Sequence, residues 1–250
     1  MLMPIGKVHS IDTFSTLDGP GIRTVVFMQG CHLRCKYCQN PDTWNPTTAM
    51  AREYSAEETM QVILRSLPYF QASGGGVTFS GGEPLLQAEF VKEVFKRCQE
   101  YNIHTAIDTS LYVATETVLD LLPFTKLFLA DIKHINNEKS LNLTGANNRC
   151  NNENLEMINN KQVEIWIRYV VVPGFTDAED DLLVMADFIS AMDSVTRVDL
   201  LPYHSLGSHK WKLLGLKYEL DNIDPPSHER MQELKSLVER RSNKQVFIPT

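Results

Sequence analysis

The sequence predicts an α/β fold in which six βα units form an open, partial (βα)6 barrel around a parallel sheet. Apolar runs rich in β-branched and aromatic residues alternate with amphipathic helical stretches, which is the pattern of βαβ units. Six such units lie between Ile22 and Leu201, whereas a closed TIM barrel needs eight. In addition, the polar residues that could bind a ligand or take part in catalysis lie at or just after the ends of the predicted strands, where parallel sheets bind ligands.

The individual elements follow from local patterns. Ser55 and Glu58 have the Ser-x-x-Glu spacing of a capping box, and Pro68 is expected to end the helix that they begin. The predicted helices cover residues 55–67, 87–101, 116–122, 151–160, 177–192 and 227–241. The predicted strands cover residues 5–14, 22–29, 74–80, 103–108, 127–131, 163–172, 197–201 and 245–248. Because no linker, repeat or low-complexity tract interrupts them, we expect one domain spanning residues 1–250.

The composition excludes several classes of function. The net charge of −7, without a basic stripe, argues against a nucleic-acid partner. No apolar run approaches the ~20 residues of a membrane-spanning helix. The first five residues, Met1–Ile5, lack the charged and apolar regions of a secretory signal. Five cysteines without such a signal favour a reducing compartment, so we expect a cytoplasmic protein.

The chemistry centres on a loop with three cysteines, Cys31, Cys35 and Cys38, which follows the apolar strand at residues 22–29. Thiolate groups favour zinc or iron–sulphur clusters. A structural zinc site usually has four protein ligands, and an electron-transfer cluster usually has four cysteines. Three cysteines therefore indicate a metal centre with one open position, although a zinc site completed by His32 or His9 is the alternative.

Other polar groups follow later strands. They are Gly81-Gly82-Glu83, Asp108, Asp131 with Lys133, and His204 in the run Leu200-Leu201-Pro202-Tyr203-His204. Each has an ordinary alternative: a strand-to-helix turn, a helix cap or a loop histidine. Arg168 interrupts the apolar strand at residues 163–172, where a cation is costly unless an anion pairs with it. That anion is either a protein carboxylate or a carboxylate-bearing ligand.

Together, the Cys-x3-Cys-x2-Cys loop and the later Gly-Gly-Glu turn resemble the radical S-adenosylmethionine (SAM) superfamily. The resemblance implies a partial barrel of the radical SAM type and one 4Fe–4S cluster held by Cys31, Cys35 and Cys38. It also implies that SAM chelates the fourth iron and that Gly81, Gly82 and Glu83 contact its amino group. In this family, one electron cleaves SAM to methionine and a 5′-deoxyadenosyl radical.

The run Asp18-Gly19-Pro20-Gly21-Ile22-Arg23 narrows the resemblance to the activating enzymes of glycyl-radical enzymes, most closely the pyruvate formate-lyase type. The chain then resembles an oxidoreductase that removes a hydrogen atom from a backbone glycine of a pyruvate formate-lyase-like partner. A reduced flavodoxin or ferredoxin is the implied electron donor. Asp18, near the protein substrate, and Lys133, near SAM, are the implied catalytic residues.

The same resemblance assigns further residues to the cofactor. Tyr37, inside the cysteine loop, and Lys133 are implied SAM neighbours, His204 is placed near the adenine, and Arg168 is a candidate partner of a carboxylate. Asp108 and Asp131 are implied to lie beside SAM and to bind a monovalent cation, with Thr109 a weaker candidate.

Three features bear on the exact partner. No cysteine lies between Cys38 and Glu83, so the chain lacks the inserted ferredoxin-like domain of several other activases. Gln39 and Ala106, however, stand where the formate-lyase type is expected to have His and Cys. The alternatives are an activase of a different glycyl-radical enzyme and a radical SAM enzyme that acts on a small molecule.

Overall fold

The computed structural model describes residues 4–48 and 51–249. Most of the segment Met1–Ile5, which was expected to lack a secretory signal, lies outside the described residues. The chain divides into two compact units. The first comprises residues 1–32 and 43–129, and the second comprises residues 33–42 and 130–250. The expectation of one domain stays a prediction.

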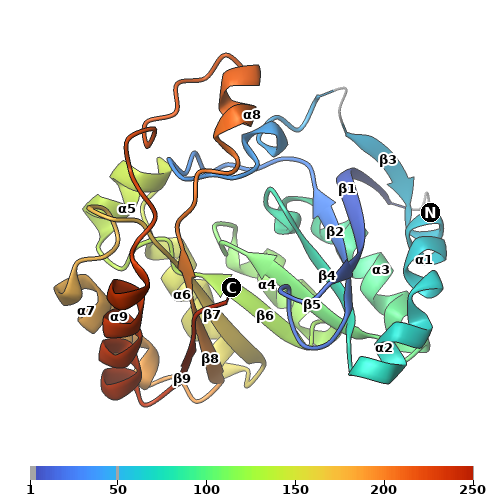
Figure 1. Ribbon diagram of the computed structural model, residues 1–250. Helices are drawn as coiled ribbons and strands as arrows, with labels where there is room; N and C mark the ends of the chain where they lie inside the picture. Colours follow the sequence, from blue (N-terminus) through green and yellow to red (C-terminus); the bar gives the residue numbers. More distant parts are fainter. Residues whose placement is uncertain (1–3, 49–50, 250) are drawn as a thin grey trace. The chain divides into compact units, whose positions relative to one another are not determined.

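The first unit is built on parallel strands with an antiparallel border. Strands β2 (Arg23–Met28), β4 (Gly76–Gly81) and β5 (His104–Thr109) pair in parallel in that order. Strand β1 (Ile5–Ser15) pairs antiparallel with β2, and β3 (Arg52–Ser55) pairs antiparallel with β1 (Figure 1). The helices are α1 (Ala56–Arg65), α2 (Leu67–Ser73), α3 (Ala88–Glu100) and α4 (Thr115–Leu121), with 3-10 turns at Pro84–Gln87 and Leu122–Phe124.

The core of this unit forms where α3 covers β4. Strand β4 is buried along five of its six residues, as expected for a parallel strand covered on both faces. Phe79 meets Phe90 and Phe95 of α3 edge to face, with ring centroids 6.1 and 5.4 Å apart. Fully burying one such side chain contributes about 1.5–3 kcal/mol. This packing fixes the carboxyl end of β4, where the Gly-Gly-Glu turn begins.

The second unit repeats the parallel arrangement. Strands β7 (Glu164–Val171), β8 (Val195–Pro202) and β9 (Gln245–Phe247) pair in parallel. Helices α7 (Glu179–Ser190) and α9 (His228–Ser242) pack side by side (Figure 1). The unit also holds α5 (Asn137–Thr144), α6 (Arg149–Asn160) and α8 (Ser208–Leu213). Strand β6 (Leu127–Asp131) begins in the first unit and ends in the second, and a 3-10 turn at Pro41–Thr43 closes the cysteine loop.

The predicted fold class is confirmed. All six expected barrel strands are present as β2, β4, β5, β6, β7 and β8, and the sheet stays open because β3 and β9 each have one neighbouring strand. Several elements were not predicted, namely β3, α2, α5 and α8. The prediction at Pro68 was half right, since α1 ends at Arg65, but Pro68 lies in the first turn of a new helix, where its missing N–H costs little. In the part of the chain that the structure describes, no helix combines the length and apolar character needed to cross a membrane.

Candidate functional site

The first part of the cysteine loop is fixed within the first unit. After β2, the amide of Gly30 donates to the carbonyl of Thr43 at 2.7 Å, and the amide of Cys31 donates to that of Trp44 at 3.3 Å. Gly30 has φ of +103°, a conformation that other residues rarely adopt. These two hydrogen bonds close the base of the loop and place Cys31 directly after the end of β2.

The second part of the loop belongs to the second unit. The amides of Arg34 and Lys36 donate to the carbonyls of Thr144 and Leu143, at 2.7 and 2.9 Å, at the end of α5. Cys35 and Cys38 share one turn, in which the amide of Cys38 donates to the carbonyl of Cys35 at 3.0 Å. None of the five cysteines of the chain forms a disulfide. The loop therefore offers thiols, the donor type that iron–sulphur clusters require.

The Gly-Gly-Glu turn lies against the start of the cysteine loop, within the first unit. The amide of Gly82 donates to the carbonyl of Met28 at 2.9 Å, and that of Glu83 donates to the carbonyl of Gly30 at 2.8 Å. A Cβ at Gly82 would lie 2.2 Å from the carbonyl oxygen of Gly30 and 3.4 Å from the Cβ of Cys31. Only glycine allows this approach, so the turn fits a site that presents backbone groups beside the first cysteine.

Glu83 itself is buried and fully engaged. Its carboxylate accepts hydrogen bonds from the hydroxyl groups of Thr109 and Ser110, both at 2.6 Å. It also accepts from the amides of Ser110 and Leu85, at 2.9 and 3.2 Å. Burial raises the pKa of the Glu83 carboxyl, although these hydrogen bonds oppose the shift. Since a carboxylate has about four acceptor positions, the side chain holds the turn in place, and the glycine backbone is left to meet a ligand.

The end of β5 joins the same group of residues. Asp108 and Thr109 are its last two residues, and Ser80 of β4 donates to the Asp108 carboxylate at 2.7 Å. The first unit thus brings Cys31, the Gly-Gly-Glu turn, Asp108 and Thr109 to the carboxyl ends of three adjacent parallel strands. In parallel α/β sheets this edge binds ligands.

Asp18 lies in the turn that precedes β2. Its carbonyl accepts a hydrogen bond from Thr78 Oγ1 at 2.6 Å, and its carboxylate accepts from Ser15 Oγ at 2.5 Å. Arg23, the first residue of β2, is fully buried and donates to Thr78 Oγ1 and to the carbonyls of Val77 and Pro20. Burial lowers the pKa of Arg23 to about 10, and the Asp18 charge opposes that shift. The backbone of Asp18 is therefore fixed against the middle of β4.

The second unit groups Tyr37, Asp131 and Lys133. The Lys133 ammonium lies 2.7 Å from the Asp131 carboxylate and 5.9 Å from the centre of the Tyr37 ring. Burial lowers the pKa of Lys133, but the charges of Asp131, Tyr37 and Cys35 and the hydrogen bond to Asp131 together hold that pKa well above the usual value. Burial raises the pKa of Tyr37. The unit thus places the Lys133 ammonium between the Asp131 carboxylate and the ring of Tyr37.

Arg168 and His204 come from β7 and from the segment after β8. Arg168 is opposite Asp199 in the parallel register, but Asp199 has its 2.7 Å ion pair with Arg197. The strand is less buried than its apolar sequence indicates. Alternate residues of β7 are buried, and Arg168 is on the half-buried face. The His204 side chain is exposed, and its carbonyl accepts from Gln39 Nε2 at 2.7 Å.

Three residues that contact the cysteine loop were not among the predicted site residues. Gln39 was noted only as a departure from the expected pattern, and Lys210 and Trp211 had no assigned role. Within the segment Tyr37–Asp42, the Gln39 side chain donates to the carbonyl of Tyr37. The Lys210 side chain donates to Asn40 Oδ1, and that of Trp211 donates to the carbonyl of Cys38. A tryptophan and a lysine in a short polar stretch far along the chain gave no periodic signal that could have revealed this. In the described ranges, no three His, Cys, Asp or Glu side chains are grouped closely enough to hold a metal ion.

Comparisons with known proteins show the family to which the chain is similar. The profile of the radical SAM superfamily matches residues 25–186. The chain is 44% identical over 234 residues to a pyruvate formate-lyase-activating enzyme of Staphylococcus epidermidis, covering 91% of this chain and 93% of that protein. It is 43% identical over 245 residues to the pyruvate formate-lyase 1-activating enzyme of Escherichia coli K12, covering 97% and 99%. A domain of a pyruvate-formate lyase-activating enzyme from Bacteroides vulgatus has a similar structure, with a TM-score of 0.60 and 28% identity, covering 71% of this chain and all of that one.

We expect Cys98 to resist alkylation in the folded protein. Its side chain is fully buried in α3, and burial raises the pKa of its thiol to about 12. At pH 8 its thiolate fraction is therefore about 10⁻⁴, and the thiolate is the reactive form. Treating cluster-free protein with iodoacetamide and mapping the adducts by mass spectrometry should label the half-buried Cys31, Cys38 and Cys150 and leave Cys98 unmodified. All five should react in denaturant, and labelling of Cys98 as fast as Cys150 would contradict the expectation.

Proposed function

Because the chain belongs to the radical SAM superfamily and, within it, to the pyruvate formate-lyase-activating enzymes, we propose that it generates a glycyl radical on a pyruvate formate-lyase-like partner. Membership of the superfamily gives the enzyme a 4Fe–4S cluster and SAM as cofactors. The proposed activity removes one hydrogen atom from the Cα of a glycine in the partner. It takes place in the cytoplasm, where cysteine thiols stay reduced.

The observation that carries the proposal is the close approach of the Gly-Gly-Glu turn to the cysteine loop. The 2.8 Å hydrogen bond from Glu83 to Gly30, and the absence of room for a Cβ at Gly82, hold backbone groups beside Cys31. We assign Cys31, Cys35 and Cys38 as the ligands of three irons, which leaves one iron open for SAM. We further assign the backbone of Gly81 and Gly82 to the SAM amino group, with Glu83 as the residue that positions it.

We assign the remaining candidates to SAM and to a cation. In the first unit we assign Asp108, with Thr109 beside it. In the second unit we assign Tyr37, Lys133, Arg168 and His204 to SAM, and Asp131 to a monovalent cation together with Asp108. Asp131 and Lys133 form a 2.7 Å ion pair, and charged groups of this kind make strong hydrogen bonds to the charged methionine part of SAM.

Bound together, the reduced cluster and SAM supply the one-electron chemistry that yields methionine and a radical able to take a hydrogen atom from glycine. A reduced flavodoxin or ferredoxin donates the electron. The work of the protein is to orient SAM, exclude water and admit a polypeptide. We assign Asp18 to the last task, because the turn that carries it is fixed to β4 by the hydrogen bond from Thr78.

The cysteine assignment predicts a sharp division among the five cysteines. Replacing Cys31, Cys35 or Cys38 singly by serine should abolish the cluster EPR signal and SAM cleavage, because a serine hydroxyl is a poor iron ligand. Cys98→Ser and Cys150→Ser should retain the cluster after anaerobic reconstitution with iron and sulphide. Loss of the cluster in either of these two variants would replace the three-cysteine site by a different ligand set.

The cation assignment predicts that SAM affinity depends on potassium or sodium. A cation held by Asp108 would offset the repulsion between its carboxylate and that of SAM, so removing the ion should weaken binding several-fold. Asp108→Ala should bind SAM with an affinity that no longer responds to the ion, as measured by calorimetry at constant ionic strength. If wild-type affinity is also indifferent to the ion, Asp108 is an ordinary hydrogen-bond partner of Ser80.

The substrate assignment is tested by EPR of a pyruvate formate-lyase mixed anaerobically with this protein, SAM and a reductant. A glycyl-radical doublet should appear, and a lyase variant that lacks the target glycine should not show it. Asp18→Ala should lower the yield of lyase radical more than it lowers cleavage of SAM alone, because its role concerns the polypeptide. Absence of the doublet, with SAM turnover stimulated by a small molecule, would favour a small-molecule radical SAM enzyme.

A further inference from the structure

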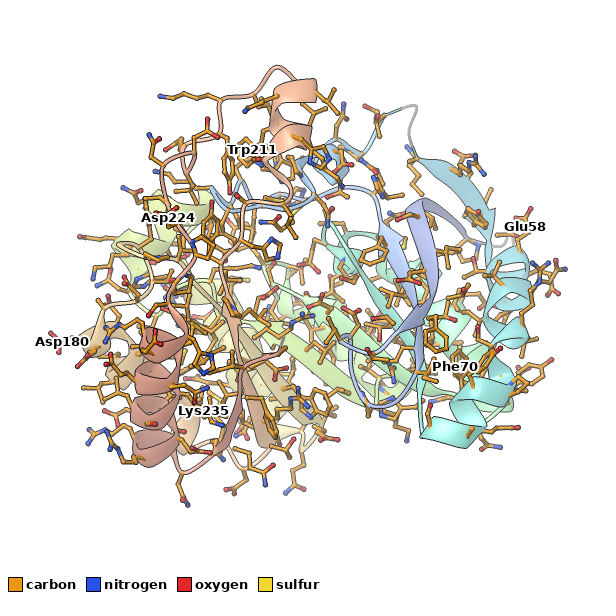
Figure 2. The ribbon with its side chains drawn as sticks, viewed as in Figure 1. Glu58, Phe70, Asp180, Trp211, Asp224 and Lys235 are labelled. Carbon is orange, nitrogen blue, oxygen red and sulfur yellow. The ribbon has the colours of Figure 1, made fainter. Side chains whose placement is uncertain are left out.

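The turn that carries Cys35 and Cys38 is contacted by a segment that follows β8, far along the chain. Trp211 projects from α8 (Figure 2) and donates from its indole nitrogen to the carbonyl of Cys38 at 2.9 Å. Its side chain is buried, with 6% of its surface exposed. A buried indole N–H that found no acceptor would be costly. The contact therefore both satisfies the tryptophan and fixes the backbone of a cysteine.

Gln39 makes a second connection, directly after Cys38. Its amide nitrogen donates to the carbonyls of His204 and Tyr37, at 2.7 and 3.2 Å. Its amide oxygen accepts from the amide of Gly207 at 2.7 Å. A Cβ at Gly207 would lie only 2.5 Å from the carbonyl oxygen of Gln39, so the two backbones touch. One side chain thus links the cysteine turn to both ends of the segment 204–207.

Lys210 makes the third connection. Its ammonium lies 2.7 Å from Asn40 Oδ1 and 3.1 Å from the Asp42 carboxylate. The Asp42 side chain is largely buried, with 8% exposed, so this ion pair is shielded from solvent. Shielded, hydrogen-bonded pairs of this kind contribute more than exposed ones. The pair holds the end of the loop just before it returns to the first unit.

The segment that makes these contacts is itself anchored to the sheet. The ring of Trp211 lies 5.3 Å from that of Tyr218, and the Tyr218 hydroxyl lies 2.8 Å from that of the fully buried Tyr203. The amide of Tyr203 in turn donates to the carbonyl of Val171, the last residue of β7. A continuous set of packed and hydrogen-bonded groups therefore runs from β7 to the carbonyl of Cys38.

We propose that Gln39, Lys210 and Trp211 form a brace that fixes the turn of Cys35 and Cys38 and so retains the iron–sulphur cluster. These are positioning residues, and the proposal rests on the proposed function for the identity of the cluster. It goes beyond that function by giving α8 and the Gln39 side chain a task. The neutral amide of Gln39 both donates to the carbonyl of His204 and accepts from the amide of Gly207, so the brace needs no charged side chain at this position.

The experiment compares two brace variants with two controls. Trp211→Phe keeps an aromatic ring and removes the indole N–H, and Gln39→Ala removes the contacts of a half-buried side chain without emptying the core. Trp166→Phe is the matched control, because the Trp166 indole donates to Glu164 at an exposed position of β7. Ser227→Ala removes the N-cap of α9 and so lowers stability without touching the brace.

The first measurement is hydrogen exchange of cluster-free protein by mass spectrometry. Loss of one brace hydrogen bond should speed exchange of the peptide 33–42 about five-fold, which corresponds to about 1 kcal/mol. In Gln39→Ala, the peptide that contains Gly207 should exchange faster as well. Neither control should change these peptides. Wild-type exchange rates in both brace variants would overturn the proposal.

The second measurement concerns the cluster in reconstituted protein. An iron chelator should remove iron several-fold faster from Trp211→Phe and Gln39→Ala than from wild type, and the EPR line shape of the reduced cluster should change. Faster exchange with unchanged iron loss, or equal iron loss in Ser227→Ala, would also refute the brace as a device for retaining the cluster. A chain that takes up no cluster would refute the proposed function instead, while the exchange rates would still decide whether the brace exists.

Discussion

The close approach of two backbone segments at Gly82 and Gly30 is the constraint on which the first half of the site depends. A hydrogen bond between main chains fixes position more tightly than a pair of long side chains could, because fewer rotatable bonds must be ordered. The carbonyl of Gly30 is reached only because the residue opposite has no Cβ. The Glu83 carboxyl group stabilises this arrangement, because it accepts four hydrogen bonds from donors of the protein itself. Glu83, which the resemblance implies to contact SAM, thus also holds the turn together.

The sequence predicted the fold well where one strong period or one local rule decided the outcome. The six barrel strands and the Ser55–Glu58 capping box belong to this group, and the box is present with both of its hydrogen bonds. The short elements escaped prediction because their order comes from tertiary contacts. Strand β3 has four residues and is ordered by pairing with β1, and α8 has six and is held by Trp211. Pro68 was misread because proline ends one helix and begins another equally well.

The residues of the candidate site could be listed from motifs, but the contacts between their side chains could not be predicted. The sequence shows that Asp131 and Lys133 are close along the chain, and the structure shows that they form a 2.7 Å ion pair. The two departures from the expected pattern also look different in the structure. Ala106 is fully buried in β5, where an alanine and a cysteine are both small apolar residues. Gln39, by contrast, has three hydrogen bonds, so its side chain is tied into the local structure.

The contact between Trp211 and Cys38 also has a consequence for the timing of biosynthesis. The two residues are 173 positions apart in the chain. At ribosomal speeds of about 5–20 residues per second, roughly 10 to 35 seconds pass between the synthesis of the cysteine and that of the tryptophan. During this interval the three thiols exist on a nascent chain in which Trp211 has not yet been synthesised. Delivery of iron and sulphide to a finished polypeptide, after release, is the order of assembly that such a separation favours.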